Sequence, residues 1–280
     1  MATHHLHHLH HLDRLAPKPV GAQHPRIREL LVLRRNPPPS SRQIIVEGAW
    51  EHERVLDSGT AIGTVLWCPE AASERLAGIA ERVAERADEV FRISERLLTR
   101  LARLGRPDGL LSVVELPAWR PEDLRIGRMS LVLVADGVEY AGNLGTLIRT
   151  VDAARADCLV LTSRRARLTH PAVYAASRGL VLTTPVFEFG EVGAAAGWLR
   201  RHGFAVHLAD PAADRGYRSI RYDGPTAFVV GSEGKGLGPG WYGHGFGTVS
   251  IPMLGLADSL NVALSAGLLL FEARARMDGW

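Results

Sequence analysis

Short apolar runs alternate with stretches of helical spacing through the second half of the chain. The runs are LVLVAD (131–136), CLVLT (158–162), FAVHLAD (204–210), TAFVVGSE (226–233) and TVSIPM (248–253). Strands that are apolar along their whole length are buried on both faces, which is typical of a parallel sheet covered by helices. The pattern therefore predicts an α/β domain with a parallel sheet over 129–280.

The first half is predicted to form a separate, smaller α/β module over 20–117. PRIRELLVLRR predicts a helix, and QIIVEGAWEHERVLDSG predicts a strand followed by a helix. TVLWCPE and LLSVVEL each predict a strand. The charged stretch 71–93 has apolar positions at helical spacing and predicts a long helix. SERLLTRLARLG predicts another helix, opened by Ser94 and closed by Gly105. Pro117, Pro121 and a mixture of charges predict a linker over 118–128.

The chain opens with a histidine-rich segment. Six of the twelve histidines lie in MATHHLHHLHHL, and nothing near them could build a core. Low complexity of this kind predicts a disordered or frayed helical tail over 1–19. Neutral imidazoles can bind zinc or nickel, but incidental disorder is the favoured interpretation, and we predict no physiological metal site.

Composition and cysteine usage are those of a globular protein of the cytoplasm. With 46% hydrophobic and 22% charged residues, the 280-residue chain has enough apolar side chains for two domains with cores of their own. Cys68 and Cys158 lie in apolar runs without a partner at metal-ligand spacing, which predicts buried free thiols in a reducing compartment. No membrane span or secretory signal is recognisable, so we expect a cytoplasmic protein with no membrane partner.

Positive charge is concentrated near one end of the chain. The net charge is only +3, but between Asp13 and Val46 seven basic residues stand against two acidic ones. Such a patch can neutralise phosphates, although charge alone fits a solvated helix face equally well. The residues in which we expect RNA contacts are Arg26, Arg28, Arg34, Arg35, Arg42 and, beyond the patch, Arg178.

Glycine-rich polar segments follow three of the predicted strands, at the ends where parallel sheets bind ligands. These segments are DGVEYAGN, GSEGKGLGPGWYGHGFG and MLGLADSLN. The run 234–240 has neither the G-x-G-x-x-G nor the P-loop spacing, and no G-x-S-x-G elbow occurs, so the dehydrogenase, nucleotide hydrolase and esterase classes lose their main support. Close backbone approach to an adenosyl ligand would suit such loops.

Three segments together resemble the motifs of the SpoU/TrmH class of RNA methyltransferases, which have the SPOUT fold. GNLGTLIRT (142–150) resembles the first motif, FVVGSEGKGL (228–237) the second and VSIPMLGLADSLNVALSAG (249–267) the third. They occur in order, each at a strand end, and the resemblance covers about residues 128–277. It implies a deep trefoil knot in the C-terminal sheet, an exception to the rule against knotted connections.

The resemblance implies transfer of a methyl group from S-adenosylmethionine to a ribose 2′-hydroxyl of RNA. The residues implied in catalysis are Asn143, Arg149, Glu233, Ser259 and Asn261, and those implied in cofactor binding are Gly231, Ser232, Gly236, Ile251, Met253 and Leu260. Arg149 would orient the hydroxyl and a phosphate, unless it merely pairs with Asp152. Asp258 or Ser259 would serve as the N-cap of the last helix.

The N-terminal module and the last helix indicate the partners. HPRIRELLVLRR and the strand after it are similar to an RNA-binding domain, related to a ribosomal-protein fold, that precedes many family members. This favours ribosomal RNA, in particular 23S, as the substrate. The final helix is apolar nearly all round until Glu272 and needs a second surface to cover it. Family members are homodimers in which the partner chain completes the active site.

One segment departs from the commonest family pattern. EYAGN stands where D-P-G-N is often found, so that Tyr140 and Ala141 replace an acid and a proline. Together with AASRGLVLTTPV, this segment is similar to members that confer resistance to ribosome-targeting antibiotics. Three other hypotheses stay open: a transfer-RNA ribose methyltransferase, a knotted RNA-binding protein without turnover, and a nucleotide-dependent oxidoreductase.

Overall fold

The computed structural model describes residues 17–35, 37–38, 40–102 and 107–279. These divide into two compact units, one reaching to Pro117 and including Thr169–Pro171, the other comprising Ala118–Leu168 and the chain from Ala172 onward. Most of the predicted tail, 1–16, lies outside the described residues, and its end forms strand β1 (Lys18–Pro19). No helix in the described ranges is both long and apolar enough to cross a membrane.

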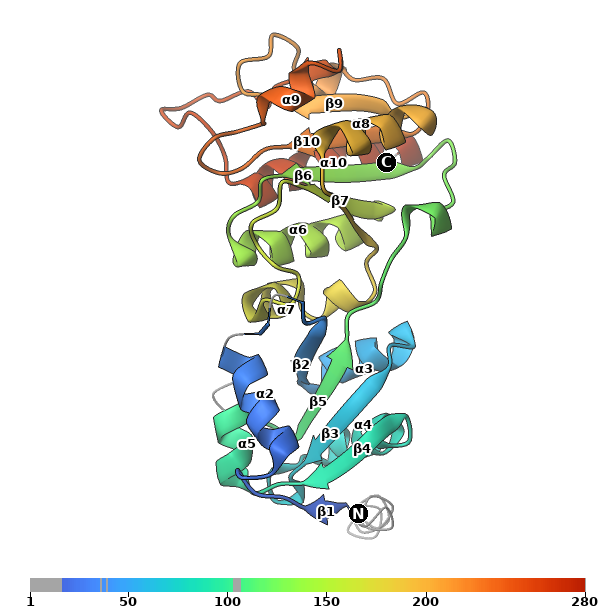
Figure 1. The fold of residues 1–280 in the computed structure, drawn as a ribbon. Helices are drawn as coiled ribbons and strands as arrows, with labels where there is room; N and C mark the ends of the chain where they lie inside the picture. Colours follow the sequence, from blue (N-terminus) through green and yellow to red (C-terminus); the bar gives the residue numbers. More distant parts are fainter. Residues whose placement is uncertain (1–16, 36, 39, 103–106, 280) are drawn as a thin grey trace. The chain divides into compact units, whose positions relative to one another are not determined.

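The N-terminal unit is built on a five-stranded sheet with the order β1-β4-β3-β5-β2 (Figure 1). Its elements are α2 (Pro25–Arg35), β2 (Gln43–Glu47), α3 (Ala49–Ser58), β3 (Ile62–Trp67), α4 (Glu74–Ala84), β4 (Ala87–Arg92), α5 (Glu95–Leu101) and β5 (Leu110–Glu115). Strand β5 runs antiparallel to β2 and β3, whereas β3, β4 and β1 are parallel. Buried Ile27 and Leu30 of α2 and Leu98 of α5 form its core with the sheet.

The single long helix predicted over 71–93 is wrong. Helix α4 ends at Ala84, and Ala87–Arg92 form strand β4 between β3 and β1. In this strand Phe91 pairs in register with Leu66 and is buried in the core. Pairing with a strand that is distant in sequence has outweighed the local helical spacing.

Two local predictions are confirmed: the N-cap of α5 and the state of the two cysteines. Ser94 is the N-cap of α5, and its side-chain oxygen accepts a hydrogen bond from the backbone N–H of Leu97. Cys68 and Cys158 are both buried free thiols.

The C-terminal unit contains a six-stranded parallel sheet with the order β11-β9-β10-β6-β7-β8, which confirms the predicted fold class. Its strands are β6 (Leu131–Asp136), β7 (Cys158–Thr162), β8 (Val186–Phe189), β9 (Ala205–Ala209), β10 (Thr226–Val230) and β11 (Gly247–Val249). Its helices are α6 (Ala141–Ala153), α7 (Pro171–Ser177), α8 (Val192–Arg201), α9 (Pro239–Tyr242) and α10 (Val262–Asp278). The edge strand β8 was not predicted.

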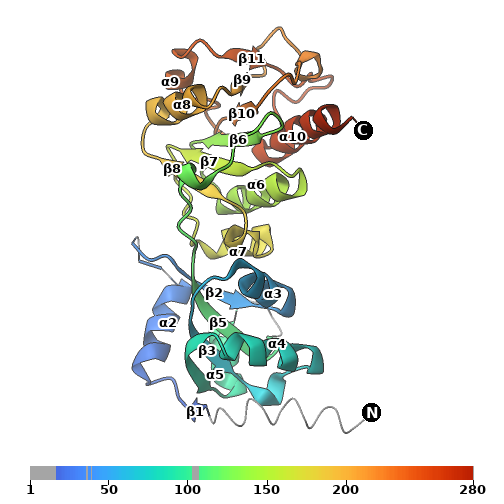
Figure 2. The ribbon, with the colours of Figure 1, turned by 90° about the vertical axis from the view of Figure 1, so that its right-hand side faces the viewer.

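Helices cover both faces of this sheet (Figures 1 and 2). Trp198 of α8 shares a buried cluster with Val132 and Val134 of β6, whereas α6 and α10 pack together on the opposite face. Because successive side chains alternate between the faces of a strand, Leu133 points toward α6 and α10. Strand β10 lies between β9 and the much earlier β6. The predicted knot fits this insertion of a late strand beside an early one.

Candidate active site

A cavity of about 360 Å³ lies at the carboxyl ends of β9, β10 and β11. Its walls are the segment after β9, the turn after β10, the loop between β11 and α10, and the start of α10. The residues that the family resemblance assigns to the cofactor all line it: Gly231, Ser232, Gly236, Ile251, Met253 and Leu260. Glu233 and Ser259 line it as well. Three segments that are far apart in the sequence thus meet at the sheet edge where ligands of parallel sheets bind.

The turn after β10 requires a glycine at position 231. Ser232 and Gly236 exchange backbone hydrogen bonds of 3.0 Å in both directions, which closes 232–236 into a tight loop. A Cβ atom on Gly231 would lie 2.1 Å from the carbonyl carbon of Gly236. Gly236 itself has a φ of +65°, in the left-handed region that favours glycine. The turn therefore presents bare backbone to the cavity.

Asp136, a residue that the sequence analysis missed, fastens this turn to the sheet. It is the last residue of β6 and is buried. One carboxylate oxygen accepts a hydrogen bond from Thr162 Oγ1 at 2.8 Å, and the other accepts one from the backbone N–H of Gly238 at 3.1 Å. An acid that ends an otherwise apolar strand was the signal in the sequence.

A chain of side-chain hydrogen bonds joins the three motifs beside the cavity. Asn261 Nδ2 donates to Asn143 Oδ1 at 3.2 Å, and Asn143 Nδ2 donates to Glu233 Oε1 at 2.5 Å. The second carboxylate oxygen of Glu233, Oε2, is buried and has no hydrogen-bond partner among the described residues. A buried oxygen without a donor is costly unless a ligand supplies one. This oxygen is an unpaired acceptor on a side chain that lines the cavity.

The sequence suggested Asp258 or Ser259 as the N-cap of the last helix, but the N-cap is Asn261. Asn261 Oδ1 accepts the backbone N–H of Ala263 at 3.0 Å. Ser259 is exposed, and its hydroxyl donates to Asp258 at 3.2 Å. Ser259 therefore does not cap the helix, and it lines the cavity. Asn261 both caps the helix and donates a hydrogen bond to Asn143.

The charged residues that line the cavity are all acidic: Asp210, Glu233 and Asp258. Tyr242 holds Asp210 in place by donating its hydroxyl proton to Oδ2 at 2.8 Å. Burial and this hydrogen bond raise the pKa of Tyr242 to about 12, so the phenol keeps its proton at neutral pH. The cavity suits a ligand with excess positive charge and disfavours an anionic dinucleotide.

Arg149 does not reach this cavity from its own chain. It lies exposed on α6 and makes no ion pair with Asp152 or hydrogen bond of its side chain within the described residues. Arg149 is three residues beyond Thr146, so the two share a helix face. Thr146 lines a different depression, the groove between α6 and α10.

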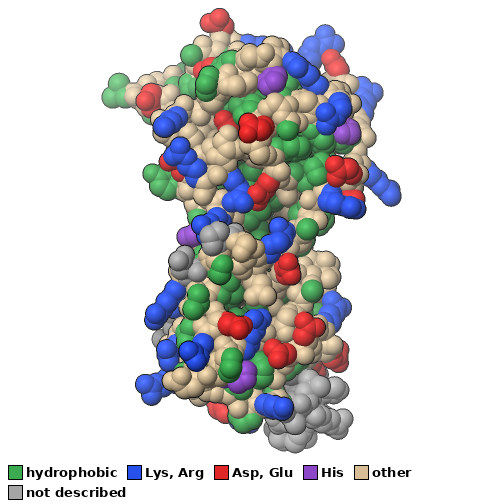
Figure 3. All heavy atoms as spheres, in the orientation of Figure 1, with side chains coloured by type: hydrophobic (Ala, Val, Ile, Leu, Met, Phe, Trp, Pro, Cys, Tyr) green, Lys and Arg blue, Asp and Glu red, His purple; other side chains and the backbone are tan. Residues whose placement is uncertain are grey.

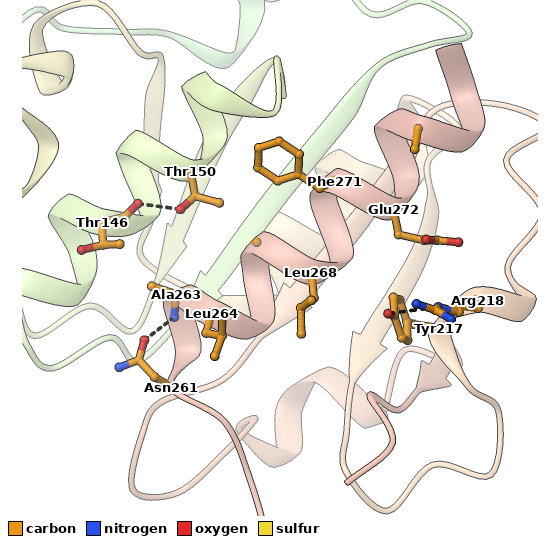
Figure 4. Close-up of a pocket in the computed structure, with 12 residues that line it drawn as sticks. Thr146, Thr150, Tyr217, Arg218, Asn261, Ala263, Leu264, Leu268, Phe271 and Glu272 are labelled. Carbon is orange, nitrogen blue, oxygen red and sulfur yellow. Dashed lines mark hydrogen bonds between the residues drawn. The ribbon is translucent and has the colours of Figure 1, made fainter. Parts of the chain in front are cut away.

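That groove, of about 730 Å³, is lined mainly by apolar side chains of α10 (Figure 4). Leu264, Leu268 and Phe271 project from the helix and are 54%, 37% and 43% exposed. Thr146 and Thr150 of α6 border the groove on one side, and Tyr217 and Arg218 border it on the other. Asn261 lines its end, so the groove begins where the hydrogen-bonded chain of the active site ends.

Three of the arginines expected to bind RNA donate hydrogen bonds within the N-terminal unit. Arg26 Nε donates to Thr64 Oγ1 at 2.8 Å, and Arg34 donates twice to the carbonyl of Ala102, at 3.2 and 2.8 Å. Arg42 donates to two carbonyl groups, of Leu116 at 3.0 Å and of Pro117 at 2.7 Å. These bonds join residues far apart in the sequence and favour a structural role.

The remaining arginines of the unit form a basic surface. Arg28 and Arg35 of α2 are exposed, and so are Arg96 and Arg100 of α5, the helix that packs against α2. Figure 3 shows Lys and Arg side chains along this side of the unit. The α5 residues were missed because they lie outside the charged segment that the sequence singled out. In the other unit, Arg178 is exposed just after α7.

The fold, with a glycine-walled cavity at the carboxyl edge of a parallel sheet, is that of the SPOUT RNA methyltransferases. An RNA 2′-O ribose methyltransferase of known structure superposes with a TM-score of 0.76 at 31% identity, over 92% of this chain and 98% of that one. The AdoMet-bound rRNA methyltransferase from Sinorhizobium meliloti superposes with a TM-score of 0.82 at 25% identity, over 92% and 97%.

Sequence comparisons agree with the structural ones. An uncharacterized tRNA/rRNA methyltransferase of Synechocystis is 27% identical over 260 residues, which are 90% of this chain and 91% of that protein. The chain spans only 58% of the length of a TrmH-family relative from Staphylococcus haemolyticus. The model of the SpoU rRNA methylase family matches residues 130–271. The chain belongs to this family and is an RNA methyltransferase.

Proposed function

We propose that the protein transfers the methyl group of S-adenosylmethionine to a ribose 2′-hydroxyl of ribosomal RNA. The observation that supports this best is the cavity of about 360 Å³ at the end of β10, which is walled by bare glycine backbone and by Glu233, a residue with one carboxylate oxygen unpaired among the described residues. The cavity lies beside the Asn143 side chain, which comes from the first motif.

S-adenosylmethionine is the cofactor that fits this cavity. Its sulfonium and ammonium groups outnumber its single carboxylate, which matches a lining whose charged residues are all acidic. Ile251, Met253 and Leu260 supply apolar surface for an adenine, and the turn 232–236 offers backbone groups to its polar edge. When bound, the cofactor supplies an activated methyl group on a positively charged sulfur.

The residues of the chain position the nucleotide. Asn143 is fixed by Glu233 on one side and Asn261 on the other, so it can hold the sugar without reorganisation. A guanidinium stays cationic at neutral pH, and we therefore assign Arg149 the binding of a phosphate and the orientation of the hydroxyl, not removal of the proton.

We infer that a second copy of the chain occupies the α6–α10 groove. Three exposed apolar side chains of one helix form a surface that water disfavours, and the groove runs up to Asn261 of the active site. Arg149 shares a helix face with groove-lining Thr146, so dimerisation would bring it toward the cavity of the partner chain. Such a dimer would explain why Arg149 does not line the cavity of its own chain.

Replacing Phe271 with aspartate is expected to give a monomer, because dimerisation would bury an unpaired charge. The variant should also lose methylation while each chain keeps its fold. Molar mass from light scattering checks the first expectation and labelled methyl incorporation the second. Val32→Asp, at a 57% exposed apolar position of α2, is the matched control and should leave the mass unchanged. A dimeric Phe271→Asp protein would exclude this interface.

Ribosomal RNA is the proposed substrate because a separate unit with the exposed arginines of α2 and α5 precedes the catalytic unit. Purified protein with methyl-labelled S-adenosylmethionine should label 23S RNA and not transfer RNA. Alkaline hydrolysis should then leave one labelled, uncleaved dinucleotide, since a methylated 2′-oxygen cannot attack the adjacent phosphate. Labelling of transfer RNA would favour the alternative substrate, and an alkali-labile product would place the methyl group on a base.

A further inference from the structure

The start of α6 departs from the usual construction of a helix. Tyr140 is the N-cap residue, with φ of −91° and ψ of 123°, and its side chain makes no capping hydrogen bond. Ser, Thr, Asp or Asn at this position would stabilise the helix. The tyrosine is also 63% exposed, so it contributes little to the core. Neither capping nor packing accounts for a large aromatic side chain here.

Gly142, in the first turn of the same helix, is also unexplained by packing. It is exposed, and a Cβ atom there would have no neighbouring atom within 4 Å. Alanine would favour the helix at this position. Glycine is used where another backbone or a ligand must approach the chain closely. Tyr140 and Gly142 thus form an open surface that ends at Asn143 of the active site.

Arg165, in the loop after β7, borders this surface. The carbonyl of Val138 accepts hydrogen bonds from the backbone N–H groups of Arg165 and Ala166, at 3.2 and 3.1 Å, so the two loops run side by side. The Arg165 side chain is 59% exposed and pairs with Glu139 at 2.7 Å. Exposed ion pairs of this kind are weak, and a phosphate can replace the carboxylate.

We propose that Tyr140 is a stacking platform for an unpaired base of the RNA, and that Gly142 leaves room for its sugar and phosphate beside Asn143. Aromatic rings next to arginines bind single-stranded nucleic acid, because every unpaired base has a face that can stack. Bases inside a duplex have both faces covered. The inference rests on the proposed function and narrows its substrate to a nucleotide in a loop, bulge or single strand.

Binding of a fluorescein-labelled oligouridine and of a duplex of equal length, both to the full-length protein at one fixed salt concentration, tests the platform. Tyr140→Leu keeps an apolar side chain but removes the ring, and should weaken single-strand binding roughly 5- to 150-fold while duplex binding stays unchanged. Tyr140→Phe should bind as the wild type does. Trp119→Leu, at another exposed aromatic residue, is the matched control.

A second variant separates binding from folding. Gly142→Ala should raise the melting temperature, because alanine favours the helix, and should still weaken single-strand binding. Loss of binding in a more stable protein cannot come from misfolding. If the wild type and both variants bound single strands equally well, the proposal that Tyr140 stacks on an unpaired base would be refuted.

Cofactor uptake distinguishes the two hypotheses, since Tyr140 does not line the cavity. Normal uptake and methylation by Tyr140→Leu, with unchanged single-strand affinity, would refute the platform and leave the proposed function standing. A wild type that neither takes up S-adenosylmethionine nor methylates RNA, but whose single-strand binding depends on the ring, would refute the proposed function and leave the platform standing.

Discussion

Gly231→Ala is expected to lose most of its affinity for S-adenosylmethionine. The new methyl group would lie 2.1 Å from the carbonyl carbon of Gly236, and this neighbour is backbone in a turn closed by two hydrogen bonds. The turn must open or shift, at a cost of about 1–3 kcal/mol. If this strain is present in the complex with the cofactor, the dissociation constant rises roughly 5- to 150-fold. Calorimetric titration of the cofactor measures the change directly.

The matched control for this variant is Gly193→Ala in α8. A Cβ atom on Gly193 meets no atom within 4 Å, so cofactor affinity should equal that of the wild type. Circular dichroism and the melting temperature establish that both variants are folded. A folded Gly231→Ala protein with unchanged affinity would show that the turn after β10 is not part of the cofactor site.

Arg149→Ala is expected to lower kcat/KM for RNA methylation about 100- to 1,000-fold, the usual effect of removing one positioned cationic or hydrogen-bonding group. Cofactor affinity should stay unchanged, because Arg149 does not line the cavity. Arg149→Lys should restore only part of the rate, since an ammonium group cannot bind a phosphate through two parallel hydrogen bonds. Arg201→Ala, at an exposed arginine of α8, is the control. Full activity of Arg149→Ala would refute its assigned role.

Mixing the two defective variants tests whether the partner chain supplies Arg149. In a heterodimer of Gly231→Ala and Arg149→Ala, one cavity is intact and faces the intact arginine of the other chain. After random exchange of subunits, half of the dimers are mixed, and each mixed dimer has one complete site of its two. A quarter of all sites are then complete, so the mixture should regain about a quarter of the wild-type activity. If each chain used its own Arg149, mixing would restore nothing.

The sheet of the C-terminal unit was predictable because its strands are continuous apolar runs between glycine-rich turns. Strand β8 was not predicted because VFEF is short, lies at the sheet edge and alternates in polarity. The segment 71–93 was wrongly predicted to be one helix because the spacing of its apolar residues fits a helix locally. Only pairing of Phe91 with Leu66, a contact across the sheet, decides that its second part is a strand.

The cavity was predictable where glycine and small polar residues follow strands. Asp136 and Asp210 were missed because an acid at the end of an apolar strand is a weak signal, which looks the same in the sequence whether the acid anchors a loop or faces solvent. The arginines of the N-terminal unit show the same difficulty. Counting charges could not reveal that Arg34 and Arg42 donate to backbone carbonyls 68 and 74 residues away.

The cavity at the carboxyl ends of β9, β10 and β11 is expected to bind a cationic methyl donor. Titration of S-adenosylmethionine into the folded wild-type protein in a calorimeter tests this most directly, with NAD as the competing ligand. We predict saturable uptake of one S-adenosylmethionine per cavity and no displacement by NAD. A well-folded protein that takes up NAD but no S-adenosylmethionine would contradict the account.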